Sequence, residues 1–244
     1  KDKNLMLSGY FNLDYELNPK NTLGVQLGAG GVDTDITFET NTQHKNLFST
    51  SIDSVYHSQS NTYNPSKFSG MNTNLNYTSK IGNKGSAMYV DLDYRMSRPK
   101  SYTHNFFHRI SETTTDMINK TDILQKNNTY IDSYGTWLRH NQVLSPKTQL
   151  NSGIYFYCSN SRYAYAYGEK KNEEYVDDSN RSNRFYFDDH ILSAYTALSH
   201  KWNKKLNVTI GVKMDAYDAD GEQKTTGERI SRHEVNLLPS INIL

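Results

Sequence analysis

The chain has 244 residues, 27 of them basic and 26 acidic, and its net charge of +1 argues against a protein that grips nucleic acid through a basic surface. Hydrophobic residues make up 35%, yet there are 19 Tyr, 9 Phe and 2 Trp, which is too aromatic for an intrinsically disordered chain. No stretch approaches the ~20 consecutive apolar residues of a membrane-spanning helix. The single cysteine, Cys158, excludes an internal disulfide and a multi-cysteine metal site.

The first predicted element is a long strand over residues 4–17. Because successive strand side chains point to opposite faces, a period of two gives the strand one apolar and one polar face. The length fits the roughly 9–11 tilted residues of a transmembrane β-strand, and a barrel in which alternate residues meet lipid explains the low average hydrophobicity. The apolar positions are the odd ones: Leu5, Leu7, Gly9, Phe11, Leu13, Tyr15 and Leu17.

The same alternation recurs along the chain. In one later strand, Val208, Ile210 and Val212 alternate with small or polar residues. Between 128 and 201 the pattern is less clear, because residues such as Trp137 and Phe156 place apolar groups on both faces. We predict further strands over 22–40, 67–81, 86–97, 128–144, 148–166, 185–201, 205–216 and 231–244.

Short turns and long connections separate these strands. The turns recur at intervals of roughly sixty residues and contain Lys20, Lys84, Lys147 and Lys204. The long polar connections are expected at 41–66, 97–127, 167–184 and 217–230. Short turns on one side and long loops on the other are typical of bacterial outer-membrane barrels. We therefore predict an all-β fold, an antiparallel up-and-down meander that forms part of a transmembrane β-barrel. Nine strands is an odd number, whereas single-chain bacterial barrels have even numbers, so the barrel is expected to be partial.

The last sixty residues resemble a known family. The pattern comprises a strand with Tyr195-Thr196-Ala197, a turn at Asn203-Lys204-Lys205, a strand with Gly211-Val212-Lys213-Met214-Asp215, and finally Leu238-Pro239-Ser240. This order resembles the barrel of TonB-dependent outer-membrane receptors, particularly the Bacteroidetes-type outer-membrane β-barrel family. Lys213, Asp215 and Leu238 stand where that family usually has Arg, Glu and Phe.

The resemblance implies a nutrient receptor in the outer membrane of a Gram-negative bacterium. Such barrels have about 22 strands around a plugged lumen, and the plug domain carries a TonB box. Neither plug nor box is found, and the start at Lys1 lacks an initiating Met and a signal peptide. We therefore expect one partial barrel domain over 1–244. Its expected partners are outer-membrane lipid, the rest of the parent barrel and its plug, and TonB through that plug.

No motif predicts an enzyme, a cofactor or a metal. The P-loop, the Rossmann glycines, HExxH and GxSxG are absent. Asp188-Asp189-His190 could suggest a hydrolytic dyad, but adjacent strand residues point to opposite faces, so a polar pair of Asp188 and His190 is favoured. Asp218, Asp220 and Glu222 echo an incomplete calcium loop, for which a polar extracellular loop is the simpler explanation.

Two groups of aromatic residues are candidate ligand contacts. Tyrosines at bilayer edges form belts, which is the structural interpretation of both groups. The functional interpretation is a platform near the barrel mouth, on which sugars or other substrates stack. The candidates are Tyr102, Phe106 and Phe107 in the 97–127 connection, and Tyr163, Tyr165 and Tyr167, which run from the end of the 148–166 strand into the connection that follows it.

Two further hypotheses concern the surface. A basic patch in the 97–127 connection could contact lipopolysaccharide phosphates or be simply solvated; it comprises Arg98, Lys100, His104, His108 and Arg109. The two free edges of an open sheet could also pair two copies of the chain edge to edge.

Three functions therefore stay open. The first is a segment of a transport receptor, and the second is a structural or adhesive outer-membrane barrel without transport. The third is a soluble all-β carbohydrate-binding module, in which the apolar faces would pack against a second sheet.

Overall fold

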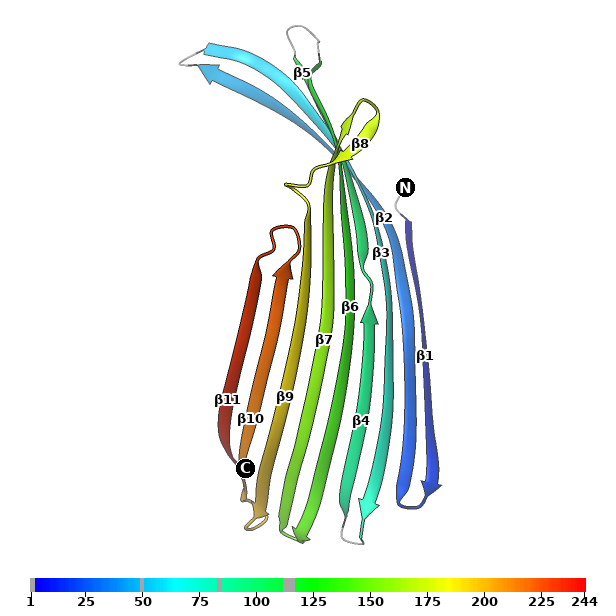
Figure 1. Ribbon diagram of the computed structural model, residues 1–244, viewed down its shortest axis with the longest axis vertical. Coiled ribbons are helices and arrows are strands. Elements are labelled where there is room, and N and C mark those ends of the chain that lie inside the picture. Colours follow the sequence, from blue (N-terminus) through cyan, green and yellow to red (C-terminus); the bar gives the residue numbers. More distant parts are fainter. Residues whose placement is uncertain (1–2, 49–50, 83–84, 112–116) are drawn as a thin grey trace.

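The computed structural model describes residues 3–48, 51–82, 85–111 and 117–244, with side chains placed in 4–43, 59–82, 85–108 and 121–244. All the described strands belong to one antiparallel sheet (Figure 1). No helix in the described part of the chain is long and apolar enough to cross a membrane. The strands are β1 (Lys3–Asn18), β2 (Asn21–Phe48), β3 (Ser51–Ile81), β4 (Ser86–Ser97), β5 (Lys100–Ser111), β6 (Met117–Ser145), β7 (Thr148–Lys171), β8 (Glu174–Asp177), β9 (Asn183–Lys201), β10 (Asn207–Gln223) and β11 (Arg229–Ile243).

Nine strands form a continuous path, β1-β2-β3-β4-β6-β7-β9-β10-β11, which confirms the predicted meander. β5 continues the line of β4, because β3 and β6 pair with both of them in succession. Arg98 and Pro99 interrupt this line, and Pro99 has no N–H to give to the ladder. At this break the backbone still forms hydrogen bonds to both neighbouring strands, β3 and β6. Arg98 N donates to Ser69 O at 2.8 Å, and Thr129 N donates to Pro99 O at 2.9 Å.

The prediction of long loops is wrong for most of the residues concerned, because those residues form strands. β2 and β3 extend through 41–66, while β5 and β6 occupy most of 97–127. β8 and the ends of β7, β10 and β11 fill much of the other two connections. Polar strands satisfy their backbone groups by pairing with each other, and polar composition does not reveal this pairing. Residues 49–50 and 112–116, which also belong to these connections, lie outside the described residues.

The short turns lie where they are predicted, together at one end of the sheet (Figure 1). In the first, Lys20 N donates to Asn18 Oδ1 at 3.0 Å. In the last, Lys205 N donates to Asn203 Oδ1 at 2.8 Å. Both are asparagine side chains that close a local turn on the backbone two residues on. Lys84, the marker of the second turn, lies outside the described residues.

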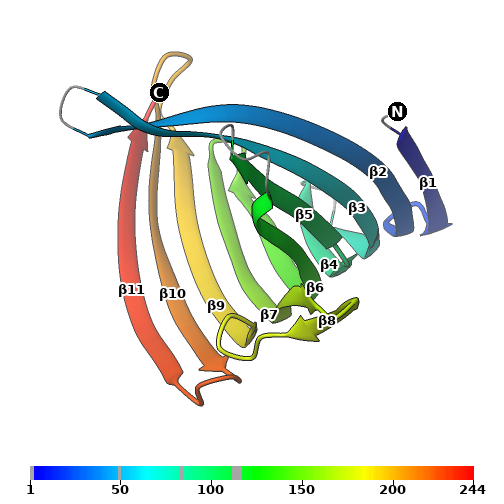
Figure 2. The ribbon, with the colours of Figure 1, turned by 90° about the horizontal axis from the view of Figure 1, so that it is seen from above.

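The sheet curves into an arc that resembles part of a barrel wall when viewed from above (Figure 2). Side chains on the concave side of such a curve converge and shield one another. Four of the least exposed polar side chains, Ser133, Ser159, Ser161 and Ser193, share one face by register and strand alternation. That face is therefore the concave one, the side of the barrel lumen.

The convex face carries an apolar band that continues from strand to strand. Thr136 on β6 pairs with Phe156 on β7, and Phe156 pairs with Leu192 on β9. The register also resolves the unclear pattern between 128 and 201, because it places Phe156 on the convex face and Trp137 on the concave face. Phe156 and Leu192 are 43% and 45% exposed, so this band faces outward and not into a protein core.

The sheet has almost no core of its own. Among the described residues, the buried hydrophobic side chains are Ala87, Tyr167 and Ala219. The concave face instead carries polar side chains and ion pairs such as Lys213 Nζ–Asp215 Oδ2 at 2.8 Å. The described strands form one sheet, and none of them belongs to a second sheet that could cover the apolar face, as a soluble sandwich would require. An exposed apolar band of this extent is suited to lipid and not to water.

Candidate ligand-facing surface

At mid-depth the concave face carries four aromatic side chains from β6, β7 and β9, here called the lumenal aromatic cluster: Trp137, Tyr155, Tyr157 and Tyr195. The rings of Trp137 and Tyr155 stack with centroids 4.1 Å apart and planes at 28°. Tyr155 and Tyr157 follow at 6.3 Å. The ring of Tyr195 lies against Gly153, where an added Cβ would stand 2.6 Å from Tyr195 Cε1. The missing side chain at Gly153 therefore makes room for the ring.

A small hollow beside the lumenal aromatic cluster combines rings with charges. It measures about 190 Å³, and Asp93, Arg95, Trp137, Tyr155 and Tyr157 line it. The rings offer flat apolar faces, while Arg95 can donate hydrogen bonds and Asp93 can accept them. This combination suits a polar ligand that has an apolar face.

Nearer the long hairpins, the same face carries a second group, here called the mouth aromatic row: Tyr163, Tyr165, Phe185 and Phe187. The rings of Phe185 and Phe187 stack with centroids 6.3 Å apart, and Tyr163 lies 6.4 Å from Phe185. Gly221 on β10 leaves space for them, since a Cβ there would stand 2.9 Å from Phe185 Cζ. Tyr163 is 40% exposed, so its ring is accessible from the lumen.

The six aromatic residues that the sequence suggests as ligand contacts lie on both faces of the sheet. Tyr163 and Tyr165 lie on the concave side of β7, and the register places Phe107 on the same side of β5. Tyr102 and Phe106 lie on the opposite side of β5. All three β5 residues are in a strand and not in a loop.

Tyr167, the sixth of these residues, is on the concave side of β7 but is only 8% exposed. The Arg181 guanidinium covers its ring at 4.9 Å and donates a hydrogen bond to its hydroxyl at 2.8 Å. Burial, together with the hydrogen bond to Glu169, raises the pKa of the Tyr167 hydroxyl. Tyr167 therefore anchors the segment after β8 and presents no free ring face.

A cluster of polar side chains, in which Asp122 is the least exposed, attaches β8 to the β5–β6 hairpin. His104 Nε2 lies 2.5 Å from Asp122 Oδ1, and the Tyr175 hydroxyl donates to the same oxygen at 2.6 Å. Burial alone would raise the pKa of the Asp122 carboxyl, but hydrogen bonds from Tyr175 and His104 outweigh it and hold that pKa below its usual value. Burial and the bond to Asp122 raise the pKa of Tyr175 to about 12.

The residues that could suggest catalysis or metal binding are dispersed. Asp188 and His190 lie on the convex face and Asp189 on the concave face. Asn160 Nδ2 donates to Asp188 Oδ1 at 2.6 Å, which satisfies that carboxylate locally. Within the described residues, no group of three or more His, Cys, Asp or Glu side chains could hold a metal ion.

A match to a protein-family model shows which family this sheet belongs to. The model described as "Outer membrane protein beta-barrel family" matches residues 80–244, which is more than half of the chain. The chain belongs to the outer membrane protein beta-barrel family. This outer-membrane β-barrel chain therefore lies in the outer membrane of a Gram-negative bacterium, with its apolar convex band toward lipid. No curated protein matches the chain.

Solved outer-membrane structures are similar to the barrel chain at low identity. The unliganded ferric citrate transporter FecA is 9% identical with a TM-score of 0.39, over 98% of this chain and 42% of that one. The ferric-catecholate import receptor Fiu from E. coli K12 is 6% identical with a TM-score of 0.46, over 99% and 46%. The outer-membrane protease OmpT from E. coli is 7% identical with a TM-score of 0.26, over 92% and 84%. The chain thus spans less than half the length of the first two proteins.

Sequence reasoning did not identify Trp137, Tyr195, Phe185 and Phe187 as candidate site residues. Only the register of the strands identifies them. Trp137 pairs with Tyr155, and Tyr195 pairs with Gly153, two residues before Tyr155 on β7. The sequence indicates which residues of a strand share a face, but it does not indicate which residues lie beside them on the neighbouring strands.

Proposed function

We propose that this barrel chain forms part of a TonB-dependent receptor of the Bacteroidetes type, which takes up a nutrient across the outer membrane. The observation that carries the proposal is the placement of the two aromatic groups. They lie on the lumenal face, away from lipid, and follow one another from the long hairpins to mid-depth. The resemblance of residues 185–244 to such receptors supports it.

In this proposal the nine-strand arc is one section of a larger barrel. β1 and β11 end the described path, and transporters with a plugged lumen have about 22 strands. The two strands would each pair with further strands of the parent barrel, and a plug domain would fill the concave side and connect the receptor to TonB. Edge-to-edge pairing of two copies is the alternative, and a purely monomeric mass in mild detergent would refute it.

The proposed ligand contacts are the exposed rings at the mouth. Tyr163, Tyr165 and Phe185 offer ring faces on the concave side, and Phe107 lies on the same side of the β5–β6 hairpin. Aromatic faces stack on the apolar faces of sugar rings and other flat ligands, and buried contacts of this kind contribute about 0.5–1.5 kcal/mol each. Tyr102 and Phe106 would contact a ligand only where it reaches over the hairpins.

Uptake by intact cells tests the proposal. Cells with and without the protein, each with TonB active or inactivated, are given a medium that contains one ferric chelate, one cobalamin and a set of neutral oligosaccharides. We expect at least one compound to be depleted only when both the protein and TonB are active. Depletion that persists without TonB, or no depletion of any compound, would contradict the transport proposal.

Paired variants test the ligand contacts. Tyr163→Ala with Phe185→Ala should raise the concentration for half-maximal uptake about tenfold, since two stacking contacts are lost. The control is Tyr94→Ala with Tyr134→Ala, which removes two touching rings, 5.1 Å apart, from the convex face. Equal effects of the two pairs would mean that the loss is structural and not due to the ligand.

A structural or adhesive barrel is the second candidate, and the β2–β3 hairpin favours it. These strands are 28 and 31 residues long, and their upper parts bend away from the sheet (Figures 1 and 2). A barrel that only adheres would show no TonB-dependent depletion. It would instead lose binding to its target surface when the hairpin is shortened.

A further inference from the structure

A groove on the convex face lies beside the apolar band, toward the long hairpins. It measures about 720 Å³ and we call it the outer groove; its lining includes Arg98, Tyr130, Arg162, Arg184 and Tyr186. Tyr130 pairs with Arg162, and Arg162 pairs with Tyr186, so aromatic and basic side chains alternate along one row. The long hairpins mark the extracellular end of such barrels, so the groove faces the outer leaflet.

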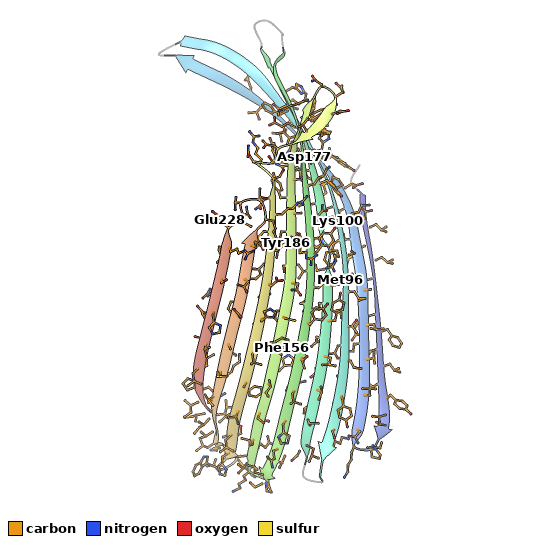
Figure 3. All side chains as sticks on the ribbon, viewed as in Figure 1. Met96, Lys100, Phe156, Asp177, Tyr186 and Glu228 are labelled. Carbon is orange, nitrogen blue, oxygen red and sulfur yellow. The ribbon has the colours of Figure 1, made fainter. Side chains whose placement is uncertain are left out.

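The row lies at the depth of lipid headgroups. Met96 is the last outward-facing apolar side chain of β4, and it pairs with Asp132 on β6. Tyr130 precedes Asp132 by two residues on β6 and so lies nearer the long hairpins. Along a tilted strand, two residues cover about 5 Å in the direction of the bilayer normal. The headgroup layer adds about 5–8 Å beyond the hydrocarbon on each side. Figure 3 shows Lys100 and Tyr186 further toward the long hairpins than Met96.

Two arginines of the outer groove have no carboxylate within ion-pair distance among the described residues, and Arg162 interacts with Asp132 only at longer range. Arg162 and Arg184 are exposed, and neither forms an ion pair within the described part of the chain. Acidic side chains next to the groove are already occupied. Asp132 accepts two hydrogen bonds from Arg98 at 2.6 Å, and Asp188 accepts one from Asn160. The groove therefore offers two unpaired guanidinium groups, which bind phosphate with two parallel hydrogen bonds.

Tyrosine rings lie against three basic side chains at the groove, one of which is Arg162. The Arg162 guanidinium lies 5.5 Å from the centroid of the Tyr186 ring, and the Lys224 ammonium lies 5.0 Å from the same ring. Arg98 lies 5.5 Å from the Tyr130 ring. Cation–π contact restricts the long basic side chains, so less entropy is lost when an anion binds. Tyrosine rings at this depth also match the sugar part of a glycolipid.

We infer that the outer groove binds the phosphate groups of a phosphorylated glycolipid in the outer leaflet, of the lipid A class. Arg162 and Arg184 contact the phosphates, Tyr130 and Tyr186 lie against the sugar rings, and the apolar band below contacts the acyl chains. The three surfaces follow one another along the strands in the order of the three parts of such a lipid. Of the basic patch that the sequence suggested for this contact, Arg98 lines the groove but is paired with Asp132, so the proposed phosphate contacts are instead the arginines on β7 and β9.

Native mass spectrometry on the natural protein tests this inference. The protein is purified from outer membranes in mild detergent and mixed with bisphosphorylated lipid A, with the same glycolipid after removal of its phosphates, or with inorganic phosphate alone. We expect retention of the phosphorylated glycolipid at least tenfold better than of the dephosphorylated one, and no saturable binding of inorganic phosphate. Equal retention of both glycolipids would overturn the role of phosphate, and tight binding of inorganic phosphate would overturn the assignment to lipid.

Charge variants locate the site. Arg162→Gln with Arg184→Gln should lower retention of phosphorylated lipid A about tenfold, whereas Arg162→Lys with Arg184→Lys should retain most of it. Lys213→Gln with Arg232→Gln removes the same charge from the concave face and should have no effect. Unchanged retention in the Gln pair, or the same loss in the concave pair, would overturn the assignment to the outer groove.

Discussion

Placing an arginine on the convex face of β10 should destabilise the barrel strongly. Val212 lies midway along the apolar stretch from Val208 to Ala216, which spans about 26 Å along the strand, or about 20 Å along the bilayer normal at a tilt of about 40°. It is therefore about 10 Å from either edge of this stretch, and its side chain is 38% exposed between Thr196 and Pro239. At such depth an arginine costs about 2–4 kcal/mol. Val212→Arg should thus lower the ratio of folded to unfolded protein by about 30- to 1000-fold.

Urea unfolding in phospholipid vesicles, followed by tryptophan fluorescence, measures this cost. Ser240→Arg is the matched control: Ser240 follows Pro239, the cross-strand partner of Val212, but it faces the lumen and is exposed. The control should cost less than about 1 kcal/mol, because lumenal substitutions in such barrels alter selectivity more than stability. Equal costs at the two positions would refute the assignment of convex face to lipid and concave face to lumen.

Three smaller perturbations test individual contacts. Gly153→Ala should cost about 1–3 kcal/mol in urea unfolding, because its Cβ would stand 2.6 Å from Tyr195 Cε1 and 2.8 Å from a backbone oxygen of β6. Arg98→Ala should cost about 1.5–3 kcal/mol in the same assay, since it removes charged hydrogen bonds at the break between β4 and β5; a cost near zero would refute their role. The lowered pKa of Asp122 means that its contribution to β8 docking is complete above pH about 4 and lost as the pH falls further. The raised pKa of Tyr175 means that its contribution is complete below pH about 10 and lost as the pH rises through about 12. The protection factors of the β8 amides, which correct hydrogen exchange for its intrinsic pH dependence, should therefore be high between these limits and lower on both sides. Asp122→Asn should lower them at neutral pH.

Strand alternation predicts the positions of the membrane-spanning strands and, outside 128–201, also the face that meets lipid. In β1, the odd residues from Leu5 to Leu17 identify the lipid face without any knowledge of neighbours, and the structure agrees. Beyond the membrane this information disappears, because both faces of a hairpin in water can be polar. For that reason the extensions of β2, β3 and β6 and the whole of β5 resemble loops in composition.

The candidate site depends on register, which the turns do not reveal by themselves. Ser145 and Thr148 pair across the turn between β6 and β7, but a shift after Val143 moves the remaining pairs by one residue. Without that shift Trp137 would pair with Phe156 and not with Tyr155. An irregularity of one residue in a short turn therefore decides which aromatic rings meet in the lumen.

The lipid-facing surface and the lumenal surface are consequently fixed by the same register. On β7, Tyr155 and Tyr157 point to the lumen while Phe156, between them, points to lipid. A slip of one residue would place two hydroxyl groups in hydrocarbon and the Phe156 ring in a polar lumen, and it would also separate Trp137 from Tyr155. The apolar band thus does more than anchor the barrel: the cost of exposing polar groups to lipid holds the lumenal rings in register. Loop sequences near the mouth can then vary without displacing the lumenal aromatic cluster, because the lipid-facing band and the short turn between β6 and β7 determine its position.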